Sequence, residues 1–120
     1  MLTQSHANTL AQAWLNAWNR HDLPDILSHY AEDISFTSPF IVALQNSSDG
    51  TVHGKTALAG YFAQGLAKYP ELAFQLLHVV TGVNSLTLIY TSVNNLLAAE
   101  VMELNREGLI QRVQAHYCQP

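Results

Sequence analysis

The residue that most invites a chemical role is a carboxylate in an apolar stretch, Glu100 in the run LLAAEVM. A carboxylate in such surroundings is costly unless it is paired or protonated. If Glu100 faces a cavity, desolvation raises its pKa, so that it donates a hydrogen bond or carries a proton near pH 7. The alternative is an exposed glutamate paired with Arg112 on the next strand. Apolar residues fall on both sides of this run, so periodicity leaves both interpretations open.

Histidines are the second group that could move protons or bind a metal. The chain has six, and none shows the tight spacing of an HxH or HExxH metal motif. The sequence therefore predicts no metal site and no cofactor. Strand alternation groups His78 with Phe74, Leu76 and Val80, so His78 could serve as a base if that side lines a cavity. The alternative is a structural histidine in the core or at an interface.

Aromatic residues at regular spacing could form the wall of a binding pocket. Trp14 and Trp18 lie one helical turn apart, and each indole offers a flat apolar surface and one N–H donor. Core packing would explain this pair without any ligand. The other residues expected in the lining or the core are Phe36, Phe40, Tyr61, Phe62, Leu88, Tyr90, Val113 and Tyr117. Tyr117, on the last predicted strand, is the best of these for a pocket rim.

Two helices are predicted before any strand. Residues 5–20 place apolar side chains at helical spacing. Asp22 can cap a second, short helix, with Pro24 in its first turn where a missing N–H does no harm. This second helix is expected to end near Tyr30.

The middle of the chain alternates between extended, looped and helical patterns. Residues 34–37 read as a short strand, and the turn-forming residues 45–52 are expected to be a loop. Residues 55–69 show a third helical pattern, which Pro70 ends.

The rest of the chain reads as four long strands. The runs are LAFQLLHVV, SLTLIYTSV, LLAAEVMEL and LIQRVQAHY. Their short separators predict an antiparallel meander. One short and four long strands, with three helices on one side, make an α+β cone formed by a single domain, residues 1–120. The space between helices and sheet is where a small ligand would bind.

Composition adds expectations about partners. Hydrophobic residues make up 48% of the chain and charged residues only 12%, against roughly 25% charge in a typical soluble protein. Because a domain of this size buries only about two thirds of its extended-chain surface, the apolar excess indicates both an internal pocket and a homodimer through the exposed side of the sheet.

Charge and hydropathy exclude several classes of partner. The net charge is -4 and the five basic residues are scattered, so the basic stripe that nucleic-acid binding needs is missing. No 18-residue apolar run predicts a membrane span, and the first residues do not resemble a signal peptide. The single cysteine, Cys118, fits a reducing compartment. We therefore expect a cytoplasmic protein.

Three stretches resemble a known superfamily: AWLNAWNRHDLPDILSHYAEDISFTSPF, VHGKTALAGYFAQGL and AAEVMELNREGLIQRVQAHY. With the order of elements, they resemble the nuclear transport factor 2-like superfamily, in particular its steroid Δ-isomerase and SnoaL-like polyketide cyclase branch. The resemblance covers nearly the whole chain. It implies the cone-shaped fold, but this fold hosts many unrelated activities.

The resemblance also implies roles for particular residues. Steroid isomerases of this superfamily move a proton with a carboxylate base, while a tyrosine and a protonated acid donate hydrogen bonds to the oxyanion. The base position corresponds to Ser38 here, the oxyanion tyrosine to Trp14, and the acid to Glu100. Family members often direct a tyrosine at the position of Tyr30 into the cavity, whereas Phe62 stands where another supporting tyrosine can occur.

Two of these positions depart from the isomerase pattern. A serine hydroxyl is too weakly basic to replace a carboxylate without its own activating base. An indole N–H donates one hydrogen bond but cannot transfer a proton. Ser38 is therefore expected to be a cavity hydroxyl that positions a ligand.

Three functions fit these features. The first is a small-molecule-binding protein of the ketosteroid isomerase-like group, whose hydrophobic pocket takes planar, apolar ligands with one polar end. The second is a proton-transfer enzyme (isomerase, cyclase or dehydratase) that uses Glu100, with His78 or Tyr30. The third is a protein-interaction module whose exposed sheet binds a partner.

Overall fold

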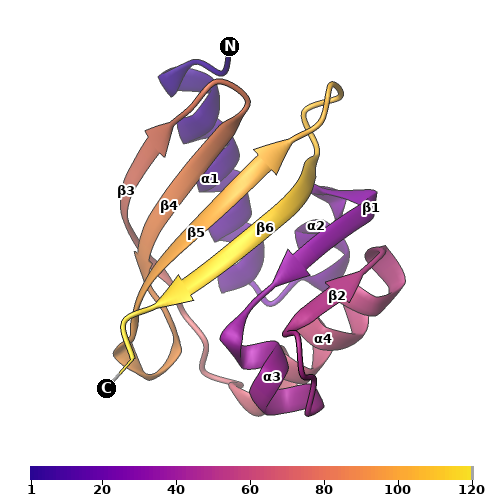
Figure 1. Ribbon diagram of the computed structural model, residues 1–120. Coiled ribbons are helices and arrows are strands. Elements are labelled where there is room, and N and C mark those ends of the chain that lie inside the picture. Colours follow the sequence, from indigo (N-terminus) through magenta and orange to yellow (C-terminus); the bar gives the residue numbers. More distant parts are fainter. Residues whose placement is uncertain (120) are drawn as a thin grey trace.

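The computed structural model describes residues 1–119, so Pro120, the last residue of the predicted domain, lies outside the described residues. The helices are α1 (Gln4–Asn19), α2 (Leu23–Ser28), α3 (Pro39–Gln45) and α4 (Lys55–Lys68), with a short 3-10 turn η1 (Val93–Asn95) (Figure 1). The strands are β1 (Tyr30–Thr37), β2 (Thr51–His53), β3 (Gln75–Thr81), β4 (Ser85–Thr91), β5 (Leu97–Leu104) and β6 (Ile110–Tyr117).

The caps of the first two helices follow from the sequence. Thr3 precedes α1, and its hydroxyl accepts a hydrogen bond from the backbone N–H of His6. Asp22 caps α2 by accepting from the N–H of Asp25, with Pro24 in the first turn. These side chains satisfy N–H groups that have no partner inside a helix.

The strands form one curved sheet in the order β2-β1-β6-β5-β4-β3. The meander β3 to β6 is antiparallel throughout, as predicted, and the α+β class is confirmed. β1, in contrast, pairs with β6 in parallel. The sheet is therefore mixed at this junction rather than antiparallel, because β1 enters from the helices and runs in the same direction as the last strand.

The segment after Ser38 differs most from the sequence expectation. Pro39 starts α3, because proline fits the first helical position, where no N–H bond is lost. Asn46, in the left-handed conformation, ends it. Part of the expected loop instead forms β2, which pairs with β1. Tyr30 begins β1 rather than ending α2, because it already pairs with Ile110 of β6.

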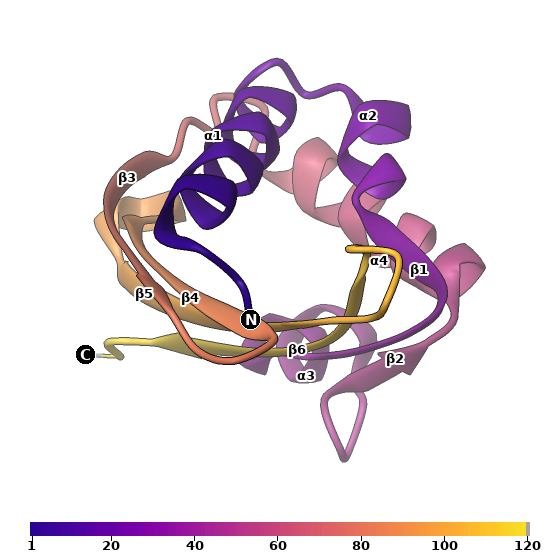
Figure 2. The same ribbon diagram turned by 90° about the horizontal axis from the view of Figure 1, so that it is seen from above.

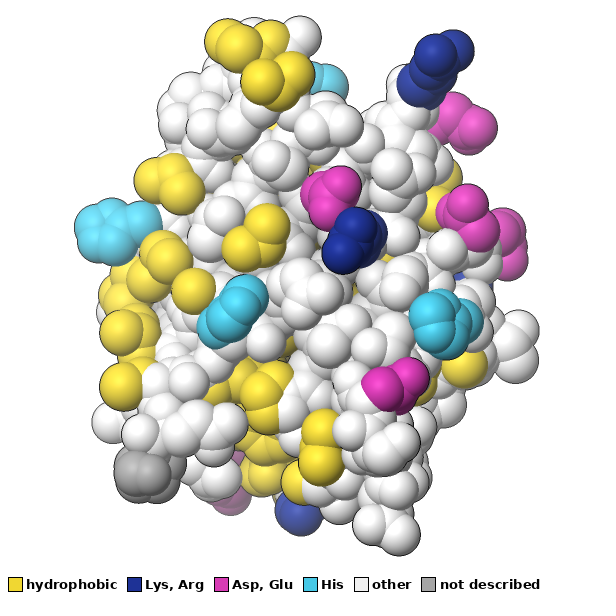
Figure 3. All heavy atoms as spheres, viewed as in Figure 1, with side chains coloured by type: hydrophobic (Ala, Val, Ile, Leu, Met, Phe, Trp, Pro, Cys, Tyr) yellow, Lys and Arg dark blue, Asp and Glu magenta, His cyan; other side chains and the backbone are white. Residues whose placement is uncertain are grey.

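The core lies between the concave side of the sheet and the helices. Figure 2 shows α1, α2 and α4 placed around this concave side, so that their apolar stripes are buried against it. The opposite side of β3–β6, called the outer face below, is not covered by any element of residues 1–119. Figure 3, viewed onto this outer face, shows hydrophobic side chains gathered toward its β3 edge.

Candidate functional site

A mostly apolar pocket opens between the concave sheet and the ends of the helices. Its free space, including the solvent in the open mouth, is about 510 Å³. It is lined by Trp14, Trp18, Phe36, Phe40, Leu44, Tyr61, Phe62, Gly65, Tyr69, Leu72, Phe74, Tyr90, Ser92, Val93, Glu100 and Tyr117. Glu100 is the only carboxylate among these lining residues.

Glu100 is on β5 and points into this pocket with only 3% of its surface exposed. The hydroxyl of Tyr90 on β4 donates a hydrogen bond to its Oε1 at 2.8 Å. Burial raises the pKa of Glu100 to about 7, and the bond from Tyr90 partly opposes this rise. The alternative pairing with Arg112 does not occur, since Arg112 lies 3.6 Å from Glu103 on the other face of β5.

Tyr117 is the second polar group beside Glu100. On the inner side of the sheet, Tyr90 is opposite Ala98, and Ala98 is opposite Tyr117. The two tyrosines therefore flank one small residue. The ring of Phe40 meets that of Tyr117 edge-on at 4.7 Å. Burial, followed by the Glu100 carboxylate, raises the pKa of Tyr117 above its ordinary value.

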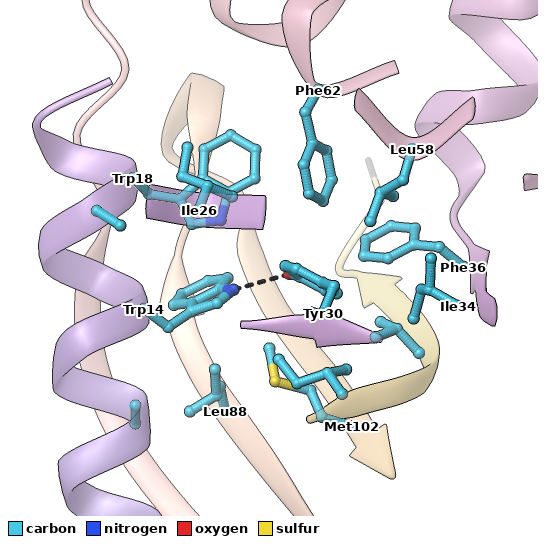
Figure 4. Close-up of a cluster of buried hydrophobic side chains, with 14 of the residues drawn as sticks. Trp14, Trp18, Ile26, Tyr30, Ile34, Phe36, Leu58, Phe62, Leu88 and Met102 are labelled. Carbon is cyan, nitrogen blue, oxygen red and sulfur yellow. Dashed lines mark hydrogen bonds between the residues drawn. The ribbon is translucent and has the colours of Figure 1, made fainter. Parts of the chain in front are cut away.

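Tyr30 lies behind the pocket wall rather than in it. Its hydroxyl accepts a hydrogen bond from the indole N–H of Trp14 at 3.0 Å, and Figure 4 shows this bond spanning the core between α1 and β1. Burial, with Glu100 as the next cause, raises the pKa of Tyr30 well above 10. Tyr30 is thus a neutral hydroxyl that supports Trp14.

The two tryptophans differ in their hydrogen bonding. Both line the pocket and both contact Phe74. The indole N–H of Trp18 is buried and has no acceptor among the described residues. Phe62 packs edge-on against Trp18 at 4.7 Å. The tryptophans therefore serve as both core and pocket wall, which are the two roles that the sequence left open.

Ser38 ends β1 and caps α3, with 1% of its surface exposed. Its Oγ accepts hydrogen bonds from the N–H of Phe40 at 3.2 Å and from the hydroxyl of Tyr61 at 3.4 Å. It is not one of the pocket-lining residues, although Tyr61 and Phe36 are. Ser38 therefore stands one layer behind the surface that a ligand would touch.

His78 does not join the site. A bulge between Leu76 and His78 shifts the alternation of β3, so that His78 pairs with Ile89 on the outer face and is exposed. Val79 takes the inner position opposite Leu88. The predicted grouping of His78 with Leu76 is therefore wrong, because an extra residue in a strand reverses the side on which later side chains lie.

Several lining residues were missed, and most of them lie at the ends of predicted elements, where the structure has no regular strand or helix. Leu44 belongs to α3, a helix that the sequence analysis did not predict. Ser92 and Val93 follow β4 at the start of η1, and Leu72 and Tyr69 lie between α4 and β3. Phe74 could have been found, since the alternation that placed it beside Leu76 was correct at that point.

Residues 1–119 offer neither a metal site nor a membrane-spanning helix. No group of three or more histidine, cysteine, aspartate or glutamate side chains is arranged to hold a metal ion. None of the helices in this part of the chain has the length and hydropathy of a membrane span.

Comparison with known proteins gives the family. Residues 11–113 match the model of the SnoaL-like domain. A SnoaL-like protein of unknown function from Burkholderia thailandensis is 33% identical, with a TM-score of 0.94 and coverage of 99% of this chain and 100% of that one. A search of curated proteins found no match.

More distant structures share the fold. A candidate ketosteroid isomerase from Kribbella flavida has a TM-score of 0.72 at 15% identity, covering 95% of this chain and 78% of that one. The epoxide hydrolase/cyclase-like enzyme SalBIII, which has a role in pyran ring formation in the polyether salinomycin, has a TM-score of 0.78 at 16% identity. The match covers 98% of this chain and 94% of that one. On the strength of the domain match and the Burkholderia protein, this chain belongs to the SnoaL-like family of the nuclear transport factor 2-like superfamily.

Proposed function

We propose that this protein binds a small, largely apolar molecule in the pocket and that Glu100 exchanges a proton with it. The observation that carries the proposal is a carboxyl group buried in an apolar pocket without a cationic partner among the described residues. Such a group is costly to bury. A pKa of about 7 populates both of its forms at neutral pH, which suits a general acid or base.

The lining supports a class of ligand. Trp14 and Phe74 are nearly stacked, with ring centroids 5.8 Å apart, and they offer a flat apolar wall. Glu100 and the Tyr90 hydroxyl supply one polar end. A planar molecule with an oxygen at one end fits this arrangement. Isomerisation, aldol-type cyclisation and dehydration all need such a proton transfer, and none of them requires a cofactor.

The test is turnover of a panel of enones and hydroxy ketones from pH 5 to 9, for the natural protein and Glu100→Gln. We expect the rate to change with an apparent pKa near 7 and to fall by about 10²–10⁴-fold in Glu100→Gln. Glu103→Gln, on the outer face, is the matched control and should retain full activity. Equal activity in both variants would refute the role of Glu100.

A binding protein without turnover is the second candidate, and Ser38 favours it. The position where isomerases carry a carboxylate base is occupied here by a serine whose oxygen caps α3. This candidate predicts saturable quenching of Trp fluorescence by flat phenols, kept in Glu100→Gln, with no product from any member of the panel.

We also propose that the outer face pairs two copies of the chain. Leu97, with 48% of its surface exposed, and Val80, with 54%, lie on this face. Sedimentation at micromolar concentration is expected to show twice the chain mass of 13.3 kDa. A single species of chain mass would contradict the pairing.

A further inference from the structure

Two hydrogen bonds mark the ends of a row of hydroxyl groups beside the pocket. At one end the Tyr90 hydroxyl donates to Glu100 at 2.8 Å. At the other end the Tyr61 hydroxyl donates to Ser38 at 3.4 Å. Tyr117 packs near both pairs, beyond Ala98 from Tyr90 and against the ring of Phe40.

Tyr117 is placed by both the sheet and α3. Ala98 separates Tyr117 from Tyr90 across the sheet. The small methyl group of Ala98 leaves room for the two rings to approach each other. On the other side Phe40, two residues after Ser38, meets its ring. The α3 segment therefore brings Ser38 toward Tyr117.

Ser38 is held in a fixed orientation by its own backbone. Its N–H donates to the carbonyl oxygen of Gly50 at 2.9 Å. Gly50 has a positive φ of +65°, and a Cβ there would lie 3.2 Å from the backbone carbonyl oxygen of Ser38. Only glycine readily allows this close approach of the two backbones.

The hydrogen-bond capacity of Ser38 gives the row a direction. A serine hydroxyl has two acceptor lone pairs and one proton to donate. Both lone pairs are used, by Phe40 and Tyr61, so the proton is left for a further oxygen. Burial raises the pKa of Tyr117, and a hydrogen bond with Ser38 partly opposes this rise, in accord with a Ser38 proton directed at the Tyr117 oxygen.

We propose that Ser38 and Tyr117 are positioning residues for Glu100, because they order a chain of hydroxyl groups that runs from Tyr61 to Tyr90 and ends on the carboxylate. Each hydroxyl donates to the next and thereby strengthens the following bond. The proposal rests on the proposed function of Glu100. It also gives Ser38 a role in proton transfer that does not require it to be a base.

The groups around Glu100 make the chain testable through its titration. The ionisable side chains coupled to Glu100 are tyrosines from four elements: Tyr30 of β1, Tyr61 of α4, Tyr90 of β4 and Tyr117 of β6. Among the described residues, burial and the bond from Tyr90 are the causes that shift its pKa. Removing a hydroxyl from the chain therefore changes one identifiable contribution.

The experiment is a carbon-13 NMR titration of glutamate-labelled protein from pH 5 to 9, with the Glu100 signal assigned by its loss in Glu100→Gln. Tyr117→Phe keeps the ring against Phe40 and removes only the hydroxyl. We expect Tyr117→Phe and Ser38→Ala to raise the apparent pKa of Glu100 by about half a unit. Ser38→Thr, which restores the hydroxyl, should return it toward the natural value.

The outcomes separate this proposal from the proposed function. Thr87→Ala, on the outer face, is the control and should leave the titration unchanged. If Tyr90→Phe raised the pKa while Tyr117→Phe and Ser38→Ala did not, the chain would end at Tyr90 and Ser38 would only cap α3. Because the titration needs no substrate, it can succeed or fail whether or not turnover of any tested compound depends on Glu100.

Discussion

Glu100 and Glu103 are three positions apart on β5 and lie on opposite faces of the sheet. Glu100 is buried, accepts one hydrogen bond from a tyrosine and has no cation beside it within residues 1–119. Glu103 is half-exposed and lies 3.6 Å from Arg112, which is itself largely exposed. One strand thus holds the same side chain in two electrostatic environments.

The difference teaches that the face of the sheet, rather than the residue type, decides the chemistry. Water and the exposed guanidinium of Arg112 lie beside Glu103, so its charge is stabilised at little cost. The apolar pocket keeps water away from Glu100, so the neutral carboxyl is favoured over the charged carboxylate. Changing either glutamate, its partner or the pH therefore tests this contrast directly.

The largest effect is expected from reversing the charge at each position. Glu100→Arg would bury an unpaired guanidinium and is expected to lower the free energy of unfolding by about 3–5 kcal/mol. Glu103→Arg would meet Arg112 at the surface and cost less than about 1 kcal/mol. Urea denaturation of both variants measures the two losses, and equal losses would contradict the assignment of the faces.

The next effect is the pH dependence of stability. The pKa of Glu100 is about 7 in the folded protein, against an ordinary value of 4.5. Between these pH values the unfolded chain releases the proton and the folded protein keeps it. The free energy of unfolding therefore falls by about 3 kcal/mol as pH rises from 4.5 to 7, and the contribution is constant above that.

Denaturation curves at several pH values would show this fall. Glu100→Gln should remove it, because glutamine does not titrate in this range, and Glu103→Gln should leave it in place. A fall that persists unchanged in Glu100→Gln would have to come from another group.

The smallest effect is expected from removing the partner of each glutamate. At pH 8, Tyr90→Phe leaves the Glu100 carboxylate without its donor and is expected to cost about 1–3 kcal/mol. At pH 5 the carboxyl is protonated and the cost should shrink. Arg112→Gln is expected to change stability by at most about 1 kcal/mol. A pH-independent cost for Tyr90→Phe would show that packing rather than charge is lost.

Much of the fold could be predicted because its signals are local. The helices were marked by caps such as Asp22 and by apolar spacing, and the strands by alternation with short turns. The inward position of Glu100 was favoured only by the family resemblance, since both sides of its strand are apolar. That ambiguity has a physical origin, because the outer face also carries apolar residues such as Leu97.

The rest depended on non-local contacts. β2 is only three residues long and exists because β1 lies beside it. The bulge that turns His78 outward is a shift in the pairing register between β3 and β4. The sequence of either strand by itself does not reveal this shift. Ser38 was predicted as a cavity hydroxyl that positions a ligand, but it lies behind the pocket lining. Its partners come from α3 and α4 and could not be found by counting along the chain.

A carboxyl group that titrates near neutral pH has a consequence for the energetics of ligand binding. An apolar ligand that displaces water from the pocket would disfavour the charged form of Glu100 still further. Binding at pH 7 would then draw protons from the buffer, a thermodynamic linkage of the kind that couples folding to pH. The calorimetric enthalpy of binding would therefore vary with the ionisation enthalpy of the buffer, and the slope of that variation would count the protons taken up.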